Sequence, residues 1–243
     1  LVDPMPHRVG FIPATATFIK ALRNWTQNHG ALLVFDEVIT YRSSFGGAQE
    51  WFKDRPDLTA LGKMIGGGFP VGAITGRADV MEVFNPLAEK VLFPHSGTFS
   101  ANPITMTAGL AAMECFDREQ VAKINRLGEI ARGQIAEAIR IAGIPACVTG
   151  GGSIFRIHFK ADPPKNYRES YVTPEDTRLI RALIDHALEE GIILISTCSG
   201  TLSTPMDQPE VDRLTDVLLS GFRKIKAMTN GAARVEHLVG SKS

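Results

Sequence analysis

The chain has 243 residues, 44% of them hydrophobic, and its 26 basic and 26 acidic residues cancel to a formal net charge of zero. This length allows one large domain or two smaller domains with cores of their own. A balanced charge without a basic run argues against nucleic acid or an anionic membrane surface as the partner. Three widely spaced cysteines, none in a C-x-x-C pair, argue against a disulfide framework or structural zinc site and indicate a reducing, cytoplasmic location.

No apolar stretch approaches the roughly 18 residues of a membrane span, so we expect no association with a membrane. The start of the sequence, LVDPMPHRVG, has no basic region followed by an apolar one and does not read as a signal peptide. It lacks an initiating methionine and reads as the end of a strand that enters a proline-rich turn. We therefore expect that sequence upstream of Leu1 is missing.

The first elements predict half of an α/β unit. Apolar residues at helical spacing predict a helix that starts at Thr15 or Thr17 and stops at Gly30. The stretch ALLVFDEV (31–38) is continuously apolar and ends in two carboxylates, which is typical of a central parallel strand covered on both faces. Helix, glycine turn and buried strand in this order favour an α/β fold.

The elements that follow are short up to residue 116. Pro103 suits the first turn of a helix, and it follows a polar, glycine-containing loop. We expect residues 1–116 to be part of a large α/β domain. The predicted segments are an apolar run at 56–63, a second at 70–76, a short helix at 77–84, the polar loop at 95–102 and a helix at 103–116.

From residue 117 the pattern changes, and we expect a smaller α/β domain over residues 117–228. Thr173 and Asp176 have the spacing of a capping box, and Gly191 is a stop signal for the same helix. Residues 229–243 are polar and predict a flexible tail. The predicted elements are a long amphipathic helix at 121–139, a glycine turn with an alternating strand at 146–159, a helix at 173–191, a strand at 192–197 and a helix at 208–225.

Asp36 and Glu37 close the predicted strand, and ligands of open α/β sheets gather at the carboxyl ends of strands. The residues alone leave two interpretations of Asp36 open, a functional carboxylate and a solvated strand end. An ionised carboxylate beside so apolar a strand needs a cationic partner, which favours the functional interpretation.

Lys63 stands before the triplet Gly66–Gly68 in the stretch ALGKMIGGGFPVGAI (60–74). It is either a surface charge or an amine that reacts with a carbonyl group. Glycines on its C-terminal side allow close approach of backbone or ligand, and partial desolvation frees the lone pair of an amine. The triplet matches neither G-x-x-x-x-G-K-[ST] nor G-x-G-x-x-G in a strand-to-helix context, which argues against a Rossmann-type nucleotide module.

The loop HSGTFSAN (95–102) offers hydroxyl and backbone N–H groups ahead of a helix. Such a loop suits a phosphate, but an ordinary helix cap explains the same residues, and the residues alone favour the cap. The six histidines show no ligand spacing, so we expect no metal site.

Three segments together resemble the class III pyridoxal-phosphate (PLP)-dependent aminotransferases: LLVFDEV (32–38), PDLTALGKMIGGGFPVGA (56–73) and HSGTFSANPITMTAGLAAME (95–114). The resemblance runs from residue 1 to about residue 227. It is strongest to the glutamate-1-semialdehyde aminomutase branch and its relatives, the transaminases of β-amino acids such as β-phenylalanine. It implies the fold type I architecture, in which a large, mostly parallel-sheet domain and a small C-terminal α/β domain form a homodimer.

The resemblance also implies roles for individual residues. Asp36 matches the carboxylate that pairs with the protonated pyridine nitrogen, and Val38 matches the residue that packs on one face of the ring. Lys63 matches the Schiff-base lysine, which also moves a proton between substrate and cofactor. Thr98 matches the threonine that reaches the cofactor phosphate of the neighbouring subunit. Glu37 is interpreted as a structural or supporting carboxylate.

The sequence departs from the family pattern in three ways. Asp3 stands where the family has the glutamate of an E-P pair. The phosphate cradle and the ring-stacking aromatic of the family belong upstream of Leu1. Some β-amino-acid transaminases also bind the substrate carboxylate through an arginine near the last strand, and residues 196–203 here contain none.

The resemblance implies an aminotransferase with PLP as its cofactor. It would move an amino group between an amino acid, including a β-amino acid, and a keto acid or aldehyde. Two alternatives stay open: a glutamate-1-semialdehyde 2,1-aminomutase, and a truncated fragment that is catalytically incomplete and exposes apolar surface. The expected partners are the small-molecule donor and acceptor and a second copy of the chain.

Overall fold

The computed structural model describes residues 1–240 and the side chains of residues 1–229, and the chain divides into two compact units. The first unit comprises residues 1–5 and 13–122, and the second comprises residues 6–12 and the residues from 123 onward. The helix α5 (Arg118–Ala142) crosses the boundary between them. The second unit therefore includes a short segment from near the start of the chain.

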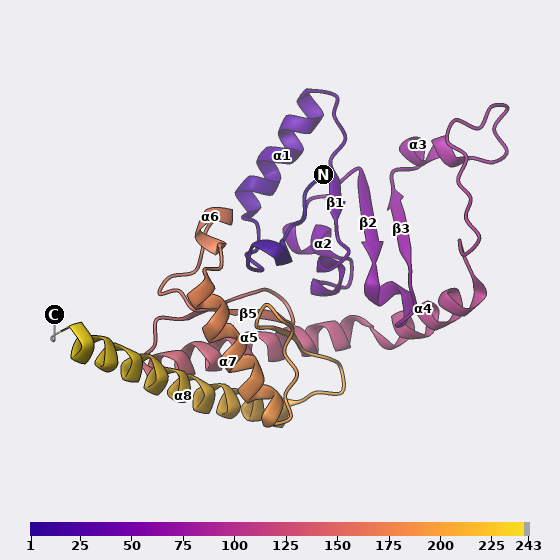
Figure 1. The fold of residues 1–243 in the computed structure, drawn as a ribbon. Helices are drawn as coiled ribbons and strands as arrows, with labels where there is room; N and C mark the ends of the chain where they lie inside the picture. Colours follow the sequence, from indigo (N-terminus) through magenta and orange to yellow (C-terminus); the bar gives the residue numbers. More distant parts are fainter. Residues whose placement is uncertain (241–243) are drawn as a thin grey trace. The chain divides into compact units, whose positions relative to one another are not determined.

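The first unit is built on a three-stranded sheet in the order β1–β2–β3 (Figure 1). β1 and β2 are parallel, with Asp36 opposite Ala60, whereas β2 and β3 are antiparallel, with Gly62 opposite Gly72. This sheet is therefore mixed within the described residues. Its elements are α1 (Ala16–Asn28), β1 (Val34–Asp36), η2 (Thr40–Ser43), α2 (Ala48–Phe52), β2 (Leu58–Gly62), η3 (Lys63–Gly66), β3 (Gly72–Gly76), α3 (Ala78–Met81), η4 (Glu82–Phe84) and α4 (Pro103–Cys115).

Local capping and apolar packing explain how α1 and β1 form. The Thr15 hydroxyl accepts a hydrogen bond from the Phe18 N–H at 3.1 Å and caps α1, so the predicted helix start at this threonine is confirmed. The apolar face of α1 places Ile19 against Leu33 and Phe35 in the core of the first unit. β1 is shorter than the strand predicted at residues 31–38 because only Val34–Asp36 pair with β2.

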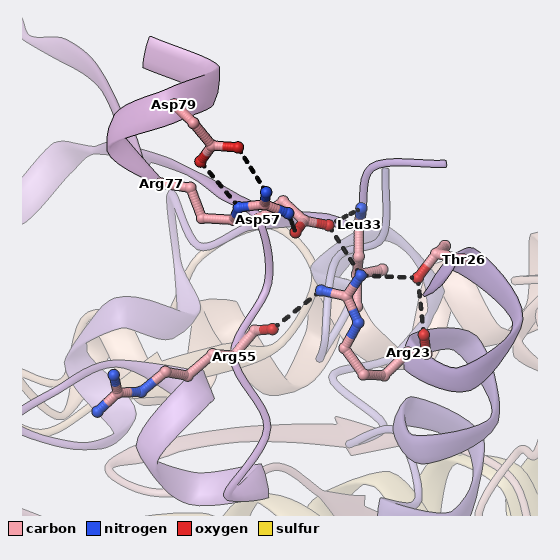
Figure 2. Close-up of polar contacts among 7 residues, drawn as sticks. All are labelled: Arg23, Thr26, Leu33, Arg55, Asp57, Arg77 and Asp79. Carbon is pink, nitrogen blue, oxygen red and sulfur yellow. Dashed lines mark hydrogen bonds and ion pairs between the residues drawn. The ribbon is translucent and has the colours of Figure 1, made fainter. Parts of the chain in front are cut away.

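A network of charged side chains lies at the end of this sheet where β2 begins (Figure 2). Asp57, buried just before β2, accepts hydrogen bonds from the Arg23 guanidinium at 2.9 Å, the Arg77 guanidinium at 2.8 Å and the Leu33 N–H at 2.7 Å. Arg77 in turn pairs with the exposed Asp79. The Asp57 carboxylate thus joins α1, β1, β2 and the end of β3 through its side-chain contacts.

The second unit contains an antiparallel sheet in the order β4–β5–β6, packed with helices. Its core includes Phe155 and Ile157 of β5, Leu183 of α7, and Leu218 and Phe222 of α8. The elements of this unit, besides most of α5, are η1 (His7–Val9), β4 (Cys147–Thr149), β5 (Ile154–His158), α6 (Tyr167–Ser170), α7 (Pro174–Glu189), β6 (Ser199–Thr201) and α8 (Gln208–Gly240).

β5 is buried on both faces, so the expected alternation of buried and exposed residues is wrong. One face carries Phe155 and Ile157 into the helical core. On the other face, the Arg156 guanidinium donates to the His7 carbonyl oxygen at 3.0 Å, and His158 Nε2 lies 3.3 Å from the Gly10 carbonyl oxygen. Residues 6–12 therefore cover the face that the pattern predicts to be solvated, and this contact is not visible in local periodicity.

The strand predicted at 192–197 is also displaced. Residues 195–199 form a tight turn, in which the Cys198 N–H donates to the Ile195 carbonyl oxygen at 2.8 Å and Cys198 takes the left-handed φ of 58°. The strand β6 begins at Ser199, the last residue of this turn, and pairs with β5. A turn with a cysteine rather than glycine in the left-handed position lacks the usual sequence signal.

The helices of the second unit match their predictions more closely. Both bonds of the capping box are present at α7, where the Thr173 hydroxyl accepts from the Asp176 N–H and the Asp176 carboxylate accepts from the Thr173 N–H. α8 continues to Gly240, through most of the range predicted as a tail, and residues 241–243 of that range lie outside the described residues. Within the described residues, no helix is long and apolar enough to cross a membrane.

Candidate active site

Asp36 and Lys63 lie at the same edge of the first sheet because β1 and β2 are parallel. Asp36 is the last residue of β1, and Lys63 follows directly after the last residue of β2. The Asp36 N–H donates to the Val2 carbonyl oxygen at 2.8 Å, and the next N–H, of Glu37, donates to Ala60 at 2.9 Å. These bonds fix the end of β1 between two neighbouring segments. The sheet thus presents a carboxylate and an amine at its carboxyl edge.

The Lys63 side chain is exposed within the part of the chain that the structure describes. It makes no hydrogen bond or ion pair with any residue for which side chains are described. The backbone of Lys63 has a φ of 51°, in the left-handed region that residues with a Cβ rarely adopt. This conformation starts η3 directly after the strand.

Val38 completes this edge. The Asp36 Oδ1 atom accepts a hydrogen bond from the Val38 N–H at 3.2 Å, which closes a tight turn at the end of β1. A Cβ placed on Gly62 would lie 3.4 Å from Val38 Cγ1, so the valine packs over the residue immediately before Lys63. The structure therefore brings Asp36, Val38 and Lys63 to one place.

Within the glycine triplet after Lys63, Gly67 serves backbone packing. A Cβ on Gly67 would lie 2.2 Å from the Ala108 carbonyl oxygen, and a Cβ on Gly109 would lie 2.2 Å from the Ile65 carbonyl oxygen. η3 and α4 can touch this closely only because both positions are glycine. The group that approaches the triplet closely, as predicted, is thus the backbone of α4 in the same unit. This contact packs η3, which begins at Lys63, against α4.

Thr98 lies in a separate, exposed turn ahead of α4. The Ser100 N–H donates to the Gly97 carbonyl oxygen at 3.0 Å, and the Asn102 side chain caps α4 by accepting from the Thr105 N–H at 2.9 Å. The cap interpretation of this loop is therefore confirmed by Asn102. The loop also borders a cavity of about 510 Å³, lined by Pro70, Val71, Gly72, Gly97, Phe99, Ser100, Ala101, Asn102, Thr105 and Met106. Neither Lys63 nor Asp36 lines this cavity.

Glu37 is the residue whose surroundings the sequence did not reveal. Its side chain is 0% exposed, and Oε2 accepts the N–H of Ala48, with a further backbone hydrogen bond from Gln49. Burial raises the pKa of the Glu37 carboxyl to about 7, although these two hydrogen bonds act to lower it. The only local signal is the pair Gly46–Gly47, which permits the turn that surrounds the carboxylate.

Comparison with known proteins identifies the family of the chain. The family model described as "Aminotransferase class-III" matches residues 1–206. The chain belongs to the class III aminotransferase family. Members of this family are PLP-dependent enzymes, so the resemblance inferred from the three motifs is confirmed, and so is PLP as the family's cofactor.

Two kinds of class III relative are similar to this chain. A glutamate-1-semialdehyde 2,1-aminomutase of Laribacter hongkongensis is 36% identical, covering 93% of this chain and 53% of the relative. An omega-transaminase of Sphaerobacter thermophilus is 41% identical with a TM-score of 0.89, covering 92% of this chain and 51% of that structure. A beta-phenylalanine aminotransferase of Variovorax paradoxus is 36% identical with a TM-score of 0.87, covering 93% and 52%. The fold is thus that of solved aminotransferases, and the chain spans about half the length of these class III proteins.

Proposed function

We propose that the complete polypeptide containing these 243 residues is a PLP-dependent aminotransferase, which moves an amino group between an amino acid and a keto acid or aldehyde. The observation that carries this proposal is the placement of Asp36 and Lys63 at the carboxyl edge of one parallel strand pair. Among the residues whose side chains the structure describes, the Asp36 carboxylate accepts a single backbone hydrogen bond and the Lys63 amine has no partner; these groups are complementary to a protonated pyridine nitrogen and an aldehyde.

The donor set at this edge fits PLP, and each residue has a distinct task. Lys63 Nζ would hold the cofactor covalently, Asp36 would pair with its ring nitrogen, and Val38 would pack on the ring. PLP, when bound, supplies an electron sink that lets the substrate lose the proton next to its amino group. The Asp36 carboxylate would hold the proton on the pyridine nitrogen, and Lys63 Nζ would accept the proton from the substrate carbon.

Thr98 extends the proposal to a second subunit. Its turn is exposed and offers a hydroxyl and backbone N–H groups, which suit a phosphate. We assign Thr98 to the cofactor phosphate of a partner subunit in a homodimer, with the complete protein in the cytoplasm. Dimerisation would then be a condition for a complete site.

The aminomutase is the second candidate because the glutamate-1-semialdehyde 2,1-aminomutase named above shares 36% identity with this chain. The beta-phenylalanine aminotransferase has the same identity and a TM-score of 0.87, and the omega-transaminase has 41% identity. These structures favour a transaminase, with β-amino acids among its candidate donors.

A test with and without an external amino acceptor separates the two candidates. We expect the PLP-loaded complete polypeptide to deaminate more than one equivalent of an amino donor such as β-phenylalanine only when a keto acid is added, with the corresponding amino acid formed in equal amount to the donor consumed beyond that first equivalent. Chromatography of both products measures this stoichiometry. Conversion of glutamate 1-semialdehyde without any added acceptor would instead establish the aminomutase.

A further inference from the structure

Glu37 follows Asp36 in the chain, and it makes hydrogen bonds both to β2, the strand that precedes Lys63, and to a neighbouring turn. Its N–H donates to the Ala60 carbonyl oxygen of β2 at 2.9 Å, and its own carbonyl oxygen accepts the Tyr41 N–H at 3.1 Å. One residue therefore fastens the end of β1 to the strand that leads into Lys63. Its two neighbours in the chain are Asp36 and Val38.

The side chain of Glu37 is enclosed by the turn that follows η2. Its Oε2 atom accepts the N–H of Ala48, and the carboxyl group takes a further backbone hydrogen bond from Gln49, at the start of α2. Gly47 has a φ of 77°, and a Cβ placed there would lie 2.4 Å from Oε2 and 2.9 Å from Tyr41 Cδ2. The turn is thus shaped around the carboxylate, and a side chain at position 47 would displace it.

This placement is costly for the stability of the fold alone. Glu37 forms no ion pair among the residues with described side chains, and its buried Oε1 atom has no hydrogen-bond partner there. An unpaired buried carboxylate loses its hydration without full compensation, and apolar residues of similar volume often replace buried charged groups without loss of stability. The stability of the core therefore does not by itself favour a carboxylate at this position.

We propose that Glu37 is a positioning residue, which holds the Asp36 carboxylate in place by tying the end of β1 to the turn at residues 47–49. This inference rests on the proposed function of Asp36 at the cofactor's ring nitrogen. The turn fixes the Glu37 side chain, and the Glu37 backbone fixes both peptide groups beside it. One of these groups belongs to Asp36, and the other carries the Val38 N–H that the Asp36 Oδ1 atom accepts.

Two conservative substitutions in the PLP-loaded complete polypeptide distinguish the effect of side-chain length at position 37 from the effect of its charge. Glu37→Gln keeps an acceptor oxygen at the same distance from the backbone, whereas Glu37→Asp keeps the charge but withdraws the oxygens by one methylene. We expect Glu37→Asp to lower kcat by about 10- to 100-fold, as a small displacement of an aligned group does. We also expect it to shift the pH midpoint of the absorbance of lysine-attached PLP by about half a unit or more.

Glu37→Gln should remain within about threefold of the unmodified enzyme in kcat, with a midpoint shift smaller than that of Glu37→Asp. Glu50→Asp is the matched control, because Glu50 also accepts a backbone N–H in this turn, from Gly46, but is exposed. This control should leave both quantities unchanged. An effect of Glu37→Gln larger than that of Glu37→Asp, or an unmoved midpoint in Glu37→Asp, would overturn the positioning role.

Covalent attachment is measured in the same samples by borohydride reduction and peptide mass spectrometry. If the unmodified enzyme carries no PLP on Lys63, the proposed function itself fails. If PLP is attached and Glu37→Asp leaves the midpoint in place, only the role of Glu37 is rejected. The two failures are therefore distinguishable.

Discussion

Replacing Lys63 with alanine is expected to abolish covalent attachment of PLP to the complete polypeptide and to lower kcat by at least about 10⁴-fold. Lys63 is the amine at the carboxyl edge of β2, and under the proposed function the substitution would remove both the covalent anchor and the group that moves the substrate proton. Alanine keeps the Cβ of lysine, so the backbone conformation at φ 51° meets the same steric conditions. Absorbance of lysine-attached PLP and single-turnover kinetics measure the two effects separately.

Lys53 offers a matched control for this substitution. It is also an exposed lysine of the first unit with a left-handed backbone, at φ 54°, but it ends α2 rather than β2. Lys53→Ala should therefore keep attached PLP and kcat within about twofold of the unmodified enzyme. Survival of both the absorbance and turnover in Lys63→Ala would show that another group holds the cofactor.

Replacing Asp57 with asparagine is expected to lower the free energy of unfolding by about 3–5 kcal/mol. The substitution leaves the Arg23 guanidinium buried without its carboxylate and weakens the contacts to Arg77 and the Leu33 N–H (Figure 2). Denaturant-induced unfolding followed by circular dichroism measures the loss. Lys63 lies at the opposite end of β2, so PLP attachment per folded molecule should stay unchanged.

Asp79→Asn provides the comparison for this network. Asp79 pairs with the same Arg77, but its side chain is 65% exposed, and such pairs contribute about 0–1 kcal/mol. Equal losses of unfolding free energy in Asp57→Asn and Asp79→Asn would contradict the structural role of the buried carboxylate.

The fall of the free energy of unfolding at acidic pH should depend on the same Asp57 carboxylate. Burial raises the pKa of Asp57, but the hydrogen bonds from Arg23, Leu33 and Arg77 outweigh burial and lower this pKa to about 2. An aspartate in the unfolded chain has a pKa near 3.9, so the stabilisation is present above about pH 4 and is lost as the pH falls towards 2. Asp57→Asn should flatten the fall of unfolding free energy in this window.

Local signals are sufficient for the elements that carry the site. The apolar run that ends in Asp36 and the run that ends at Lys63 both form strands, and the capped helix start at Thr15 is observed. The three motifs also suffice to recognise the family, because each combines a chemically constrained residue with a fixed local setting. The roles of Asp36, Val38, Lys63 and Thr98 remain predictions that the experiments above address.

Features that depend on distant contacts are not predictable from local patterns. Arg156 and His158 are buried because residues 6–12 fold over β5, about 150 residues away in the chain. The apolar run at 192–197 predicts a strand, but the turn at Cys198 shifts the pairing to Ser199–Thr201. The enclosure of Glu37 likewise depends on a turn eleven residues further along the chain. Each of these cases is tertiary structure overriding a local preference.

Mapping the site of cofactor attachment tests the account most directly. The complete polypeptide is loaded with PLP, reduced with borohydride, digested and analysed by mass spectrometry, with Lys63→Ala and Lys53→Ala treated in parallel. We predict that the reduced PLP adduct lies on the peptide containing Lys63 in the unmodified protein and in Lys53→Ala, and that Lys63→Ala carries none. An adduct on any other lysine at equal yield, or an unmodified Lys63 in the active enzyme, would contradict it.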